Sequence, residues 1–496
     1  MTAAPDTRRE LARGGMMSFA GSATSAAMGL VLIIVLGRAL GDAGSGIVLQ
    51  AIGAFTIALA VARFGQDSAA VWILPRLLED DRAAVRPTGW FLLAVSGAVG
   101  TVCALVLLLG TAIADAVSPG DPVAAALRGI VWFLPVAAVL LTALSATRAM
   151  GSLTAYVLIG SVGLPVLRPL VIILAVGAGG GAAAATVAWA LPLAPAALAA
   201  VLVLGVLLRR HGATRAPGYL RSGIPGRTVR YALPRVLSSS LEQLLIWLAV
   251  IVVGALAGPA ASGVYGAASR FVAAGMIVDT ALRVVVSPMF SRLLHRGDER
   301  GLERVYRTAT IWLVLFSAPV YLLLATFAPV ALSLLGPSFG AGEPTVVIMC
   351  AGAIVTFLAG NIHSVLLMSG RSGLAALNKA IAVATNVGLL FALVPLWGPA
   401  GAGVAWALAC MLDAVLATLQ VRFVLRLKVS PLPGLYPLLI AALTVGVPAL
   451  AIRLLWGPTW FGLIAAAAIG GALFLGWCRA DRRTLELRGL TARTAS

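Results

Sequence analysis

Apolar runs of about 20 residues recur along almost the whole sequence and leave only short polar or Gly/Pro-rich breaks between them. A helix needs about 20 apolar residues to cross the roughly 30 Å hydrocarbon core of a bilayer. Fourteen such runs can be counted, at residues 16–37, 46–74, 88–111, 122–147, 155–178, 182–207, 231–254, 261–288, 304–330, 343–369, 374–396, 399–425, 433–455 and 458–478. Nothing of comparable length remains for a soluble domain. The sequence therefore predicts an all-α polytopic membrane protein with about fourteen transmembrane helices.

Composition excludes a water-soluble fold of this length. Of the 496 residues, 60% are hydrophobic and 11% are charged, whereas a soluble domain carries about 25% charged residues. The chain therefore has too little polar surface to cover a soluble fold. The four cysteines (Cys103, Cys350, Cys410 and Cys478) each lie in an apolar stretch and lack C-x-x-C spacing. We expect them to be small core residues, so that no metal site or disulfide is predicted.

The basic residues predict how the spans are oriented. Short cytoplasmic loops of membrane proteins carry an excess of Lys and Arg. With a cytoplasmic N-terminus, 28 of the 36 basic residues fall in inside loops and tails, 2 fall outside and 6 lie within spans. Both termini are therefore expected in the cytoplasm. The inside loop at 208–230 holds six arginines and no carboxylate, which we interpret as a topology anchor rather than a specific site for anionic lipid or nucleic acid.

A repeat divides the chain. The segment GRALGDAGSG at 37–46 recurs as GALAGPAASG at 254–263, and five of ten positions match at a fixed offset of 217 residues. Each copy connects the first and second spans of a six-span set, and each is predicted to face outside. Two six-span halves of equal orientation indicate a parallel repeat about an axis along the membrane normal, an arrangement in which transporters bind substrate between the halves.

Spans and repeat together predict the domain organisation. The expected segments are a cytoplasmic N-terminal tail at 1–15, a first lobe at 16–207, a basic connector at 208–230, a second lobe at 231–425, two further helices at 426–478 and a cytoplasmic C-terminal tail at 479–496.

Several longer segments carry a family resemblance. They are LGRALGDAGSG, ARFGQDSAAVWILPRLL, YALPRVLSSSLEQLLIWLAVIVVG, SGVYGAASRF, VSPMFSRLLHRGDERGLERVYR, FAPVALSLLGPSFG and LLMSGRSGLAALNKAIAVATNVGLLFALVPLWGPAGAGVAWAL. With these loose patterns and its span count, the chain resembles polysaccharide or O-antigen flippases of the Wzx type. They belong to the multidrug/oligosaccharidyl-lipid/polysaccharide (MOP) exporter superfamily.

The resemblance implies a function, a location and partners. Such proteins move polyprenyl-diphosphate-linked oligosaccharides from the inner to the outer leaflet of the bacterial cytoplasmic membrane, through a cationic cavity between two lobes. The implied partners are the lipid-linked glycan, membrane lipids and the glycosyltransferases and polymerases of polysaccharide synthesis. Two alternatives are transporters of the same superfamily, a cation-coupled multidrug exporter and a lipid II flippase. A third is a membrane-embedded enzyme or assembly partner of polysaccharide synthesis. The chain lacks the arginine/aspartate-rich opening associated with lipid II flippases.

Six arginines lie within predicted spans: Arg63, Arg128, Arg168, Arg235, Arg270 and Arg283. A charge at the centre of a membrane helix costs about 2.5–3.5 kcal/mol on insertion scales. Arg168 lies between Pro165 and Pro169, about 20 Å along its span at 1.5 Å per residue, too deep to reach either interface easily. We expect it to line a water-filled cavity. The alternative is a structural arginine bound to neighbouring carbonyl groups.

Arginine is suited to a diphosphate because its planar guanidinium donates two parallel hydrogen bonds and stays charged. We therefore expect Arg168 and Arg270 to contact the substrate diphosphate. Arg63 and Arg235 are expected to assist at the inner side of the membrane, although Arg235 could instead only extend towards the interface. Arg128 is expected to extend towards the outer interface.

Two i,i+4 pairs occupy nearly corresponding positions of the two halves, Arg63 with Asp67 and Asp279 with Arg283. Each pair could be a local ion pair that makes burial of the charges tolerable. The alternative is an inner gate whose ion pairs break as the cavity opens.

The sequence offers Glu242, in the middle of the seventh span, as the first candidate for coupling to an H⁺ or Na⁺ gradient. A buried carboxylate can carry a proton or bind sodium, although Glu242 could also pair with an arginine on a facing helix. Asp413 is the second candidate, and His363 is expected to be a core histidine rather than a proton relay. No P-loop, H-E-x-x-H, G-x-S-x-G or paired-Cys motif occurs, so neither ATP hydrolysis, a cofactor nor an enzymatic site is predicted.

Overall fold

A computed structural model describes residues 5–211, 219, 222–427, 429–481 and 484–486. Helices are the regular elements of these residues, and none of them forms a β-strand. Eleven helices in this part of the chain are long and apolar enough to cross a membrane. The prediction of an all-α polytopic membrane protein is confirmed.

Three of the eleven helices are long enough for two crossings each: Met16–Asp80 with 65 residues, and Ile224–Gly275 and Ser372–Phe423 with 52 residues each. Each is interrupted by a glycine with non-helical backbone angles, Gly41, Gly258 or Gly398. Counting each long helix as two spans gives eleven plus three, the fourteen that the apolar runs predict.

The described chain divides into two compact units, Met1–Gly254 and Ala255–Ser496. The lobe boundaries predicted from the sequence remain predictions. Residues 1–4 and 487–496 of the predicted tails, residues 212–218 and 220–221 of the predicted connector, and residues 428 and 482–483 lie outside the described part.

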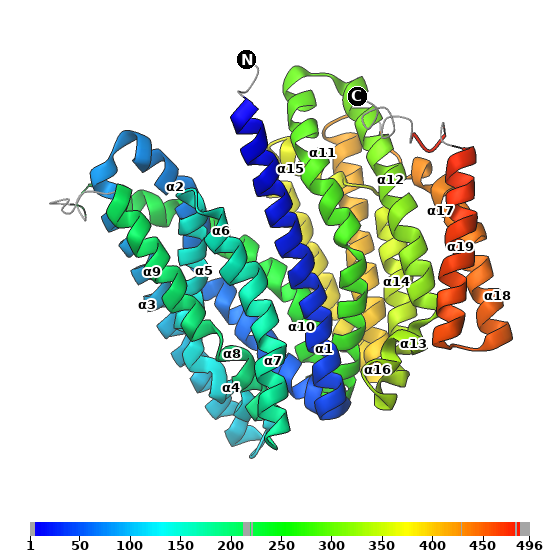
Figure 1. Ribbon diagram of the computed structural model, residues 1–496, viewed down its shortest axis with the longest axis horizontal. Helices are drawn as coiled ribbons and strands as arrows, with labels where there is room; N and C mark the ends of the chain where they lie inside the picture. Colours follow the sequence, from blue (N-terminus) through cyan, green and yellow to red (C-terminus); the bar gives the residue numbers. More distant parts are fainter. Residues whose placement is uncertain (1–4, 212–218, 220–221, 428, 482–483, 487–496) are drawn as a thin grey trace. The chain divides into compact units, whose positions relative to one another are not determined.

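The first unit contains the following elements: α1 (Pro5–Ala62), α2 (Gln66–Asp80), α3 (Arg82–Val117), α4 (Pro122–Ile130), η1 (Val131–Phe133), α5 (Leu134–Ala149), α6 (Leu153–Ala155), η2 (Tyr156–Gly163), α7 (Leu164–Gly177), α8 (Ala182–Ala190), α9 (Leu193–His211) and the first half of α10 (Ile224–Gly275). Helix α5 packs against α2, α3 and α9, while α7 packs against α1 and α8 (Figure 1).

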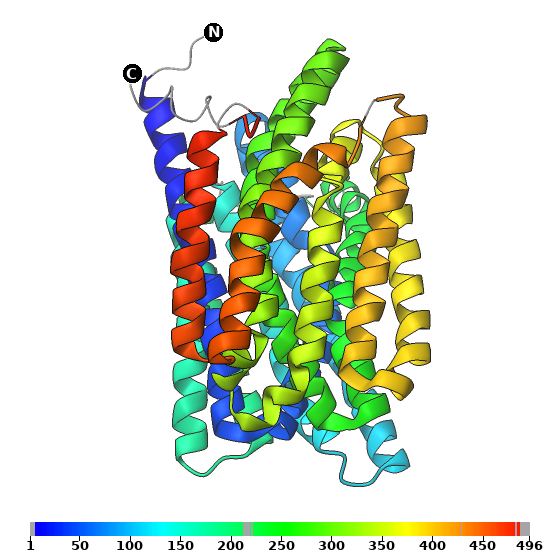
Figure 2. The same ribbon diagram turned by 90° about the vertical axis from the view of Figure 1, so that its right-hand side faces the viewer.

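The second unit contains the remainder of α10 and the following elements: α11 (Ile277–Arg296), α12 (Glu299–Thr326), α13 (Ala328–Ser333), η4 (Pro337–Gly342), α14 (Glu343–Phe357), α15 (Ile362–Met368), α16 (Ser372–Phe423), η5 (Leu432–Gly434), α17 (Leu435–Ala441), η6 (Ala442–Gly446), α18 (Val447–Trp456) and α19 (Trp460–Ala480). Helix α14 packs against α12 and α16, and α15 packs against α11 and α16. Helices α17 to α19, orange to red in Figure 2, pack on one another and on α12.

Short polar residues at the loop ends explain where several helices start. The side chain of Asp81 accepts a hydrogen bond from the backbone N–H of Ala84 at the start of α3. Asp298 does the same for Gly301 at the start of α12. Because the first N–H groups of a helix have no intrahelical acceptor, such caps stabilise the helix by about 1 kcal/mol.

The repeat found in the sequence has a structural counterpart. Gly41 has φ 68° and ψ −170°, and Gly258, its partner at the 217-residue offset, has φ 88° and ψ 169°. This region of backbone space is open essentially only to glycine. The matched glycines therefore make the same type of turn in the two copies.

Several predicted spans are split into two helices, and three of these breaks carry polar or charged residues beside them. The second breaks at residues 63–65, the eighth at Met276, and the tenth between Phe357 and Ile362. Gly65 has φ 64° and lies so close to residue 232 that an added Cβ would be 2.5 Å from the Ala232 carbonyl oxygen. Only glycine fits there without a backbone shift. The breaks bring polar and charged residues to helix ends inside otherwise apolar spans.

Candidate functional site

Arg168 lies in the first turns of α7, where the helix has an unusual start. The eight residues of η2 before it form a π-helix, a rare conformation that often marks functional positions. Pro165 stands in the first turn of α7 and Pro169 lies inside it. Because proline has no N–H, each removes a backbone hydrogen bond. The sequence thus places Arg168 beside a locally weakened helix.

The guanidinium of Arg168 lies on an aromatic ring. Its Cζ is 4.1 Å from the centroid of the Trp189 ring, which α8 supplies. The Trp189 side chain is buried and meets Phe55 of α1 edge to face, with centroids 5.6 Å apart. Among the described residues, no carboxylate forms an ion pair with Arg168, and its Nε is buried without a hydrogen-bond partner.

The ring contact offsets only part of the cost of this charge. A cation–π contact contributes about 0.5–2 kcal/mol, against about 2.5–3.5 kcal/mol for a charge at the centre of a membrane helix. The Nε of the guanidinium keeps an unsatisfied donor. The expected role of Arg168 in diphosphate binding remains a prediction.

Arg63 and Asp67 flank the break in the second predicted span. Arg63 follows the end of α1, Asp67 lies in the first turn of α2, and Arg63 Nη1 is 3.0 Å from Asp67 Oδ2. The hydroxyl of Ser96 donates to the Arg63 carbonyl oxygen. The ion pair is present, while its expected opening during transport stays a prediction.

Three further predicted residues lie along α10. Arg235 and Glu242 are in its first half, and both are exposed. The expectation that Glu242 is buried is therefore wrong, because its place in the middle of the span does not fix which face it occupies. Arg270 is half-buried in the second half, in the other unit from Arg168.

Arg128 forms an ion pair in the first unit. Its Nη1 lies 3.3 Å from Asp115 Oδ2, near the end of α3. Its expected extension towards the outer interface remains a prediction. Arg453 of α18 pairs with Glu343 at 2.6 Å and donates to the Thr326 carbonyl oxygen.

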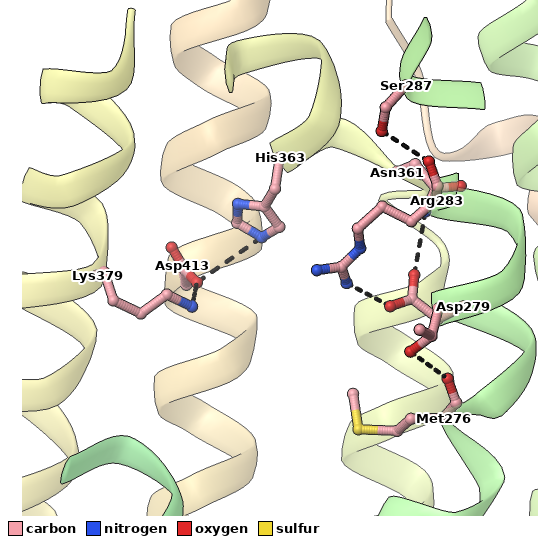
Figure 3. A network of polar contacts seen from close by, with 9 residues as sticks. Met276, Asp279, Arg283, Ser287, Asn361, His363, Lys379 and Asp413 are labelled. Carbon is pink, nitrogen blue, oxygen red and sulfur yellow. Dashed lines mark hydrogen bonds and ion pairs between the residues drawn. The ribbon is translucent and has the colours of Figure 1, made fainter. Parts of the chain in front are cut away.

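The second unit holds a polar network that links three helices (Figure 3). Its first part is the predicted pair of α11, in which Arg283 donates to Asp279 Oδ2. The other carboxylate oxygen of Asp279 accepts from Asn361 Nδ2 at 3.0 Å. Asn361 immediately precedes α15, in the break of the tenth predicted span. The broken helix therefore supplies the amide that holds Asp279.

The second part of the network joins the two halves of α16. Lys379 Nζ lies 2.8 Å from Asp413 Oδ2, across the turn at Gly398. Asn378 and Gln420 exchange two hydrogen bonds of 2.8 and 2.7 Å between the same two halves. These amides fix the register that brings Lys379 opposite Asp413.

His363 of α15 connects the two parts. Its Nε2 lies 3.7 Å from Asp413 Oδ2. In Figure 3 the guanidinium of Arg283 points towards the imidazole from the other side. The charged groups around the ring are Asp279 and Arg283 from α11, and Lys379 and Asp413 from α16. The expectation of a core histidine missed this polar environment.

The carboxylates of the network are buried and its basic groups are more open. The side chains of Asp279 and Asp413 are 8% and 7% exposed, against 55% for Arg283, 37% for Lys379 and 33% for His363. The buried carboxylates thus hold the basic side chains, whose exposed fractions are larger. Such an arrangement presents positive charge outward and is suited to an anion.

Lys379 and Asn361 were not among the site residues predicted from the sequence. A usable signal existed for Lys379, which is one of only two lysines among 36 basic residues. For Asn361 the signal was the Gly360–Asn361 dipeptide inside an apolar run, which is typical of a break. Within the described residues, no group of three His, Cys, Asp or Glu side chains could hold a metal ion.

Comparisons with known proteins give a family and a fold. The family model described as "Polysaccharide biosynthesis protein" matches residues 11–294. No curated protein matches the chain by sequence. The lipid II flippase MurJ, in an inward closed conformation, is similar in structure with a TM-score of 0.68 at 11% identity. That similarity covers 95% of this chain and 99% of MurJ.

Other MOP-superfamily transporters share the fold. An inward-facing multidrug resistance MATE family transporter has a TM-score of 0.65 at 14% identity, covering 81% of this chain and 94% of its own. A MOP superfamily transporter from Pyrococcus furiosus, described as having a binding pocket of reverse polarity, has a TM-score of 0.61 at 14% identity. It covers 84% of this chain and 95% of its own.

Proposed function

Because the chain belongs to the polysaccharide biosynthesis protein family, we propose that it is a flippase for polyprenyl-diphosphate-linked oligosaccharides. Family and fold together support a transporter of the MOP type. The proposed movement runs from the inner to the outer leaflet of the bacterial cytoplasmic membrane, by alternating access. The proposed partners are the glycan on its lipid carrier, membrane lipids and the enzymes that assemble and polymerise that glycan.

The observation that carries this proposal is the environment of Arg168. Within the described part of the chain, this arginine has an aromatic face beneath it and no carboxylate partner. A structural arginine in an apolar span would be expected to satisfy all its donors with protein groups. A buried Nε with no acceptor favours a ligand that brings its own negative charge.

A diphosphate fits this requirement. The planar guanidinium can donate two parallel hydrogen bonds to phosphate oxygens, and the ring of Trp189 fixes the plane from one side. In this proposal Arg270 is a further phosphate-binding residue, and Arg63 and Arg235 receive the headgroup at the inner side. The pairs of Asp67 and Asp279 with their arginines act as gates.

Coupling to an ion gradient is part of the same proposal. Glu242, an exposed residue of α10, is the residue we propose for H⁺ or Na⁺ coupling. A carboxylate that gains and loses a cation during the cycle changes its charge by one unit. That change can bias one conformation over another only if the ion binds the two states with different affinity.

The alternatives make different demands on the same residues. A cation-coupled drug exporter would need a binding region that attracts cations, whereas Arg168 repels them. A lipid II flippase would use the same diphosphate chemistry and differs in the sugar. A membrane-embedded enzyme of polysaccharide synthesis would need catalytic acidic residues, and a grouping of such residues was not predicted from the sequence.

Transport in proteoliposomes tests the proposal. The assay follows transbilayer movement of a short polyprenyl-diphosphate oligosaccharide by the parent chain, Arg168→Gln and Arg168→Lys. Loss of a charged hydrogen bond of about 1.5–3 kcal/mol predicts at least a roughly tenfold slower rate for Arg168→Gln. Arg168→Lys should be intermediate, because lysine keeps the charge but not the planar fork.

A matched control is Arg209→Gln, which removes an exposed arginine at the end of α9 in the same unit. Its transport should equal that of the parent. If Arg168→Gln also transports at the parental rate, the diphosphate site is not at Arg168. If the parent itself moves no lipid-linked oligosaccharide but exports cationic drugs, the flippase proposal is wrong.

A further inference from the structure

We propose that Arg283, Lys379 and His363 form a second anion-binding subsite, within the unit of residues 255–496, that takes phosphate or diphosphate groups and is completed by protonation of His363. This inference rests on the proposed function in one respect only, namely that the diphosphate is carried by a lipid. The subsite itself follows from the arrangement of the five charged groups.

The direction in which the charges face is the first argument. The three basic side chains come from α11, α15 and α16 and are a third to a half exposed, while Asp279 and Asp413 are buried behind them. A network that served only to neutralise buried carboxylates would need no open basic groups. Here three donors come from different helices, and in Figure 3 the imidazole of His363 lies between the side chains of Lys379 and Arg283.

The charge balance of the network is the second argument. With a neutral imidazole, two basic groups meet two carboxylates, so the network has no net charge. When His363 is protonated, three positively charged groups face two carboxylates, so the network gains a net positive charge. An imidazole can gain a proton in mild acid, whereas arginine stays charged at any working pH, so His363 is the basic group of the network whose charge a fall in pH can change.

The structure also provides for the protonated state. Asp413 Oδ2 receives Lys379 and is the atom nearest to the imidazole, while Asp413 Oδ1 is buried and has no donor in the described residues. A carboxylate with an unused acceptor can take one further hydrogen bond from a charged donor. Protonated His363 would carry its charge with Nε2 3.7 Å from Oδ2 of this carboxylate, so the added charge is stabilised where it forms.

Direct binding to the purified full-length chain in detergent tests the subsite. The probe is farnesyl diphosphate, measured by calorimetry at about pH 5.5 and about pH 8, the two sides of an ordinary imidazole titration. One extra charge at hydrogen-bonding range predicts about tenfold tighter binding at the lower pH. His363→Gln should remove this pH dependence, and His295→Gln, an exposed histidine of α11, should retain it.

Lys379→Gln should weaken binding about tenfold or more at both pH values, because it removes a charged donor. This change leaves Asp413 without its cation, so the double variant Lys379→Gln/Asp413→Asn keeps the pair neutral and protects folding. It should bind as weakly as the single variant. Parental affinity in a folded double variant would overturn the role of Lys379.

Two further probes separate the sources of the anion. Inorganic diphosphate that binds with the same pH dependence supports a subsite for the diphosphate group itself. Binding of farnesyl diphosphate alone, with that pH dependence, supports the subsite and identifies a lipid-linked ligand. Farnesol that binds as tightly as farnesyl diphosphate would overturn the proposal, as would a pH dependence that survives in His363→Gln.

The outcome is independent of the flippase test. One pattern would refute the subsite and leave the proposed function standing. In that pattern transport depends on Arg168 but not on pH or on His363→Gln, and diphosphate binding is independent of pH. Conversely, pH-dependent diphosphate binding by a parent that moves no lipid-linked oligosaccharide would refute the flippase and leave the subsite.

Discussion

Arg168 and the network around Asp413 are two solutions to keeping a basic group in an apolar span. Arg168 rests on the ring of Trp189 and has no carboxylate partner in the described residues. Lys379 and Arg283 each have a buried carboxylate behind them, and an imidazole lies between the two pairs. The first arrangement is a permanent charge with unused donors. The second is a balanced set of charges that one proton can unbalance.

The difference teaches what each arrangement can do. A permanent charge binds an anion at any pH and releases it only when the geometry changes. A network that contains a titratable group can bind and release an anion as the proton concentration changes. If both serve one transport cycle, the first supplies affinity and the second makes that affinity depend on the side of the membrane.

The largest expected effect is a difference in stability between a variant of the Asp413 network and a variant of Arg168. Asp413→Asn leaves Lys379 without its carboxylate, which should destabilise the chain by about 1–3 kcal/mol. Arg168→Gln removes a charge that no carboxylate balances, and its stability should stay equal or rise. Thermal unfolding of both variants in the same detergent measures the contrast.

The double variant Lys379→Gln/Asp413→Asn is the control for this contrast. By removing both charges it should recover most of the stability that Asp413→Asn loses. If Arg168→Gln is destabilised as strongly as Asp413→Asn, Arg168 has a protein partner that matters, and the distinction between the two sites fails.

A smaller effect measures how firmly Trp189 holds Arg168. A double-mutant cycle with Arg168→Gln and Trp189→Leu should give a coupling free energy of about 0.5–2 kcal/mol, the range of a partly desolvated cation–π contact. Trp189→Phe keeps an aromatic face and should retain part of that coupling. The cycle cancels the packing of Trp189 on Phe55, which is present in both branches. A coupling near zero would mean that another group holds the guanidinium.

The sequence was informative where a property depends on local order. Apolar runs predicted the fourteen spans, and the matched glycines of the repeat, Gly41 and Gly258, adopt the same backbone conformation. Spacing of four residues placed Asp67 and Asp279 beside their arginines. Each of these features depends on residues within one helix or on one turn type.

The sequence was uninformative where contacts join different helices. Lys379 and Asp413 meet only because of the turn at Gly398, and Asn361 reaches Asp279 only because the tenth predicted span is broken. The rotation of a helix about its axis is set by packing, which explains why Glu242 proved exposed. Neither a break nor a rotation follows from hydropathy.

The smallest expected effect concerns two pairs that look alike in the sequence. Arg63–Asp67 is an i,i+4 pair with little support beyond its own helix ends, whereas Asp279 is held by Asn361 as well as by Arg283. A double-mutant cycle on Arg63 and Asp67 should therefore give a coupling of about 0.3–1 kcal/mol.

The matching cycle on Asp279 and Arg283 should give a larger coupling, since the carboxylate is buried and its second oxygen is already bound. Asn361→Ala should lower that coupling towards the Arg63–Asp67 value, because Asp279 would lose the donor that fixes its orientation. Equal couplings in the two parent pairs would show that Asn361 adds nothing. The two pairs would then be equivalent local ion pairs, as their spacing alone suggests.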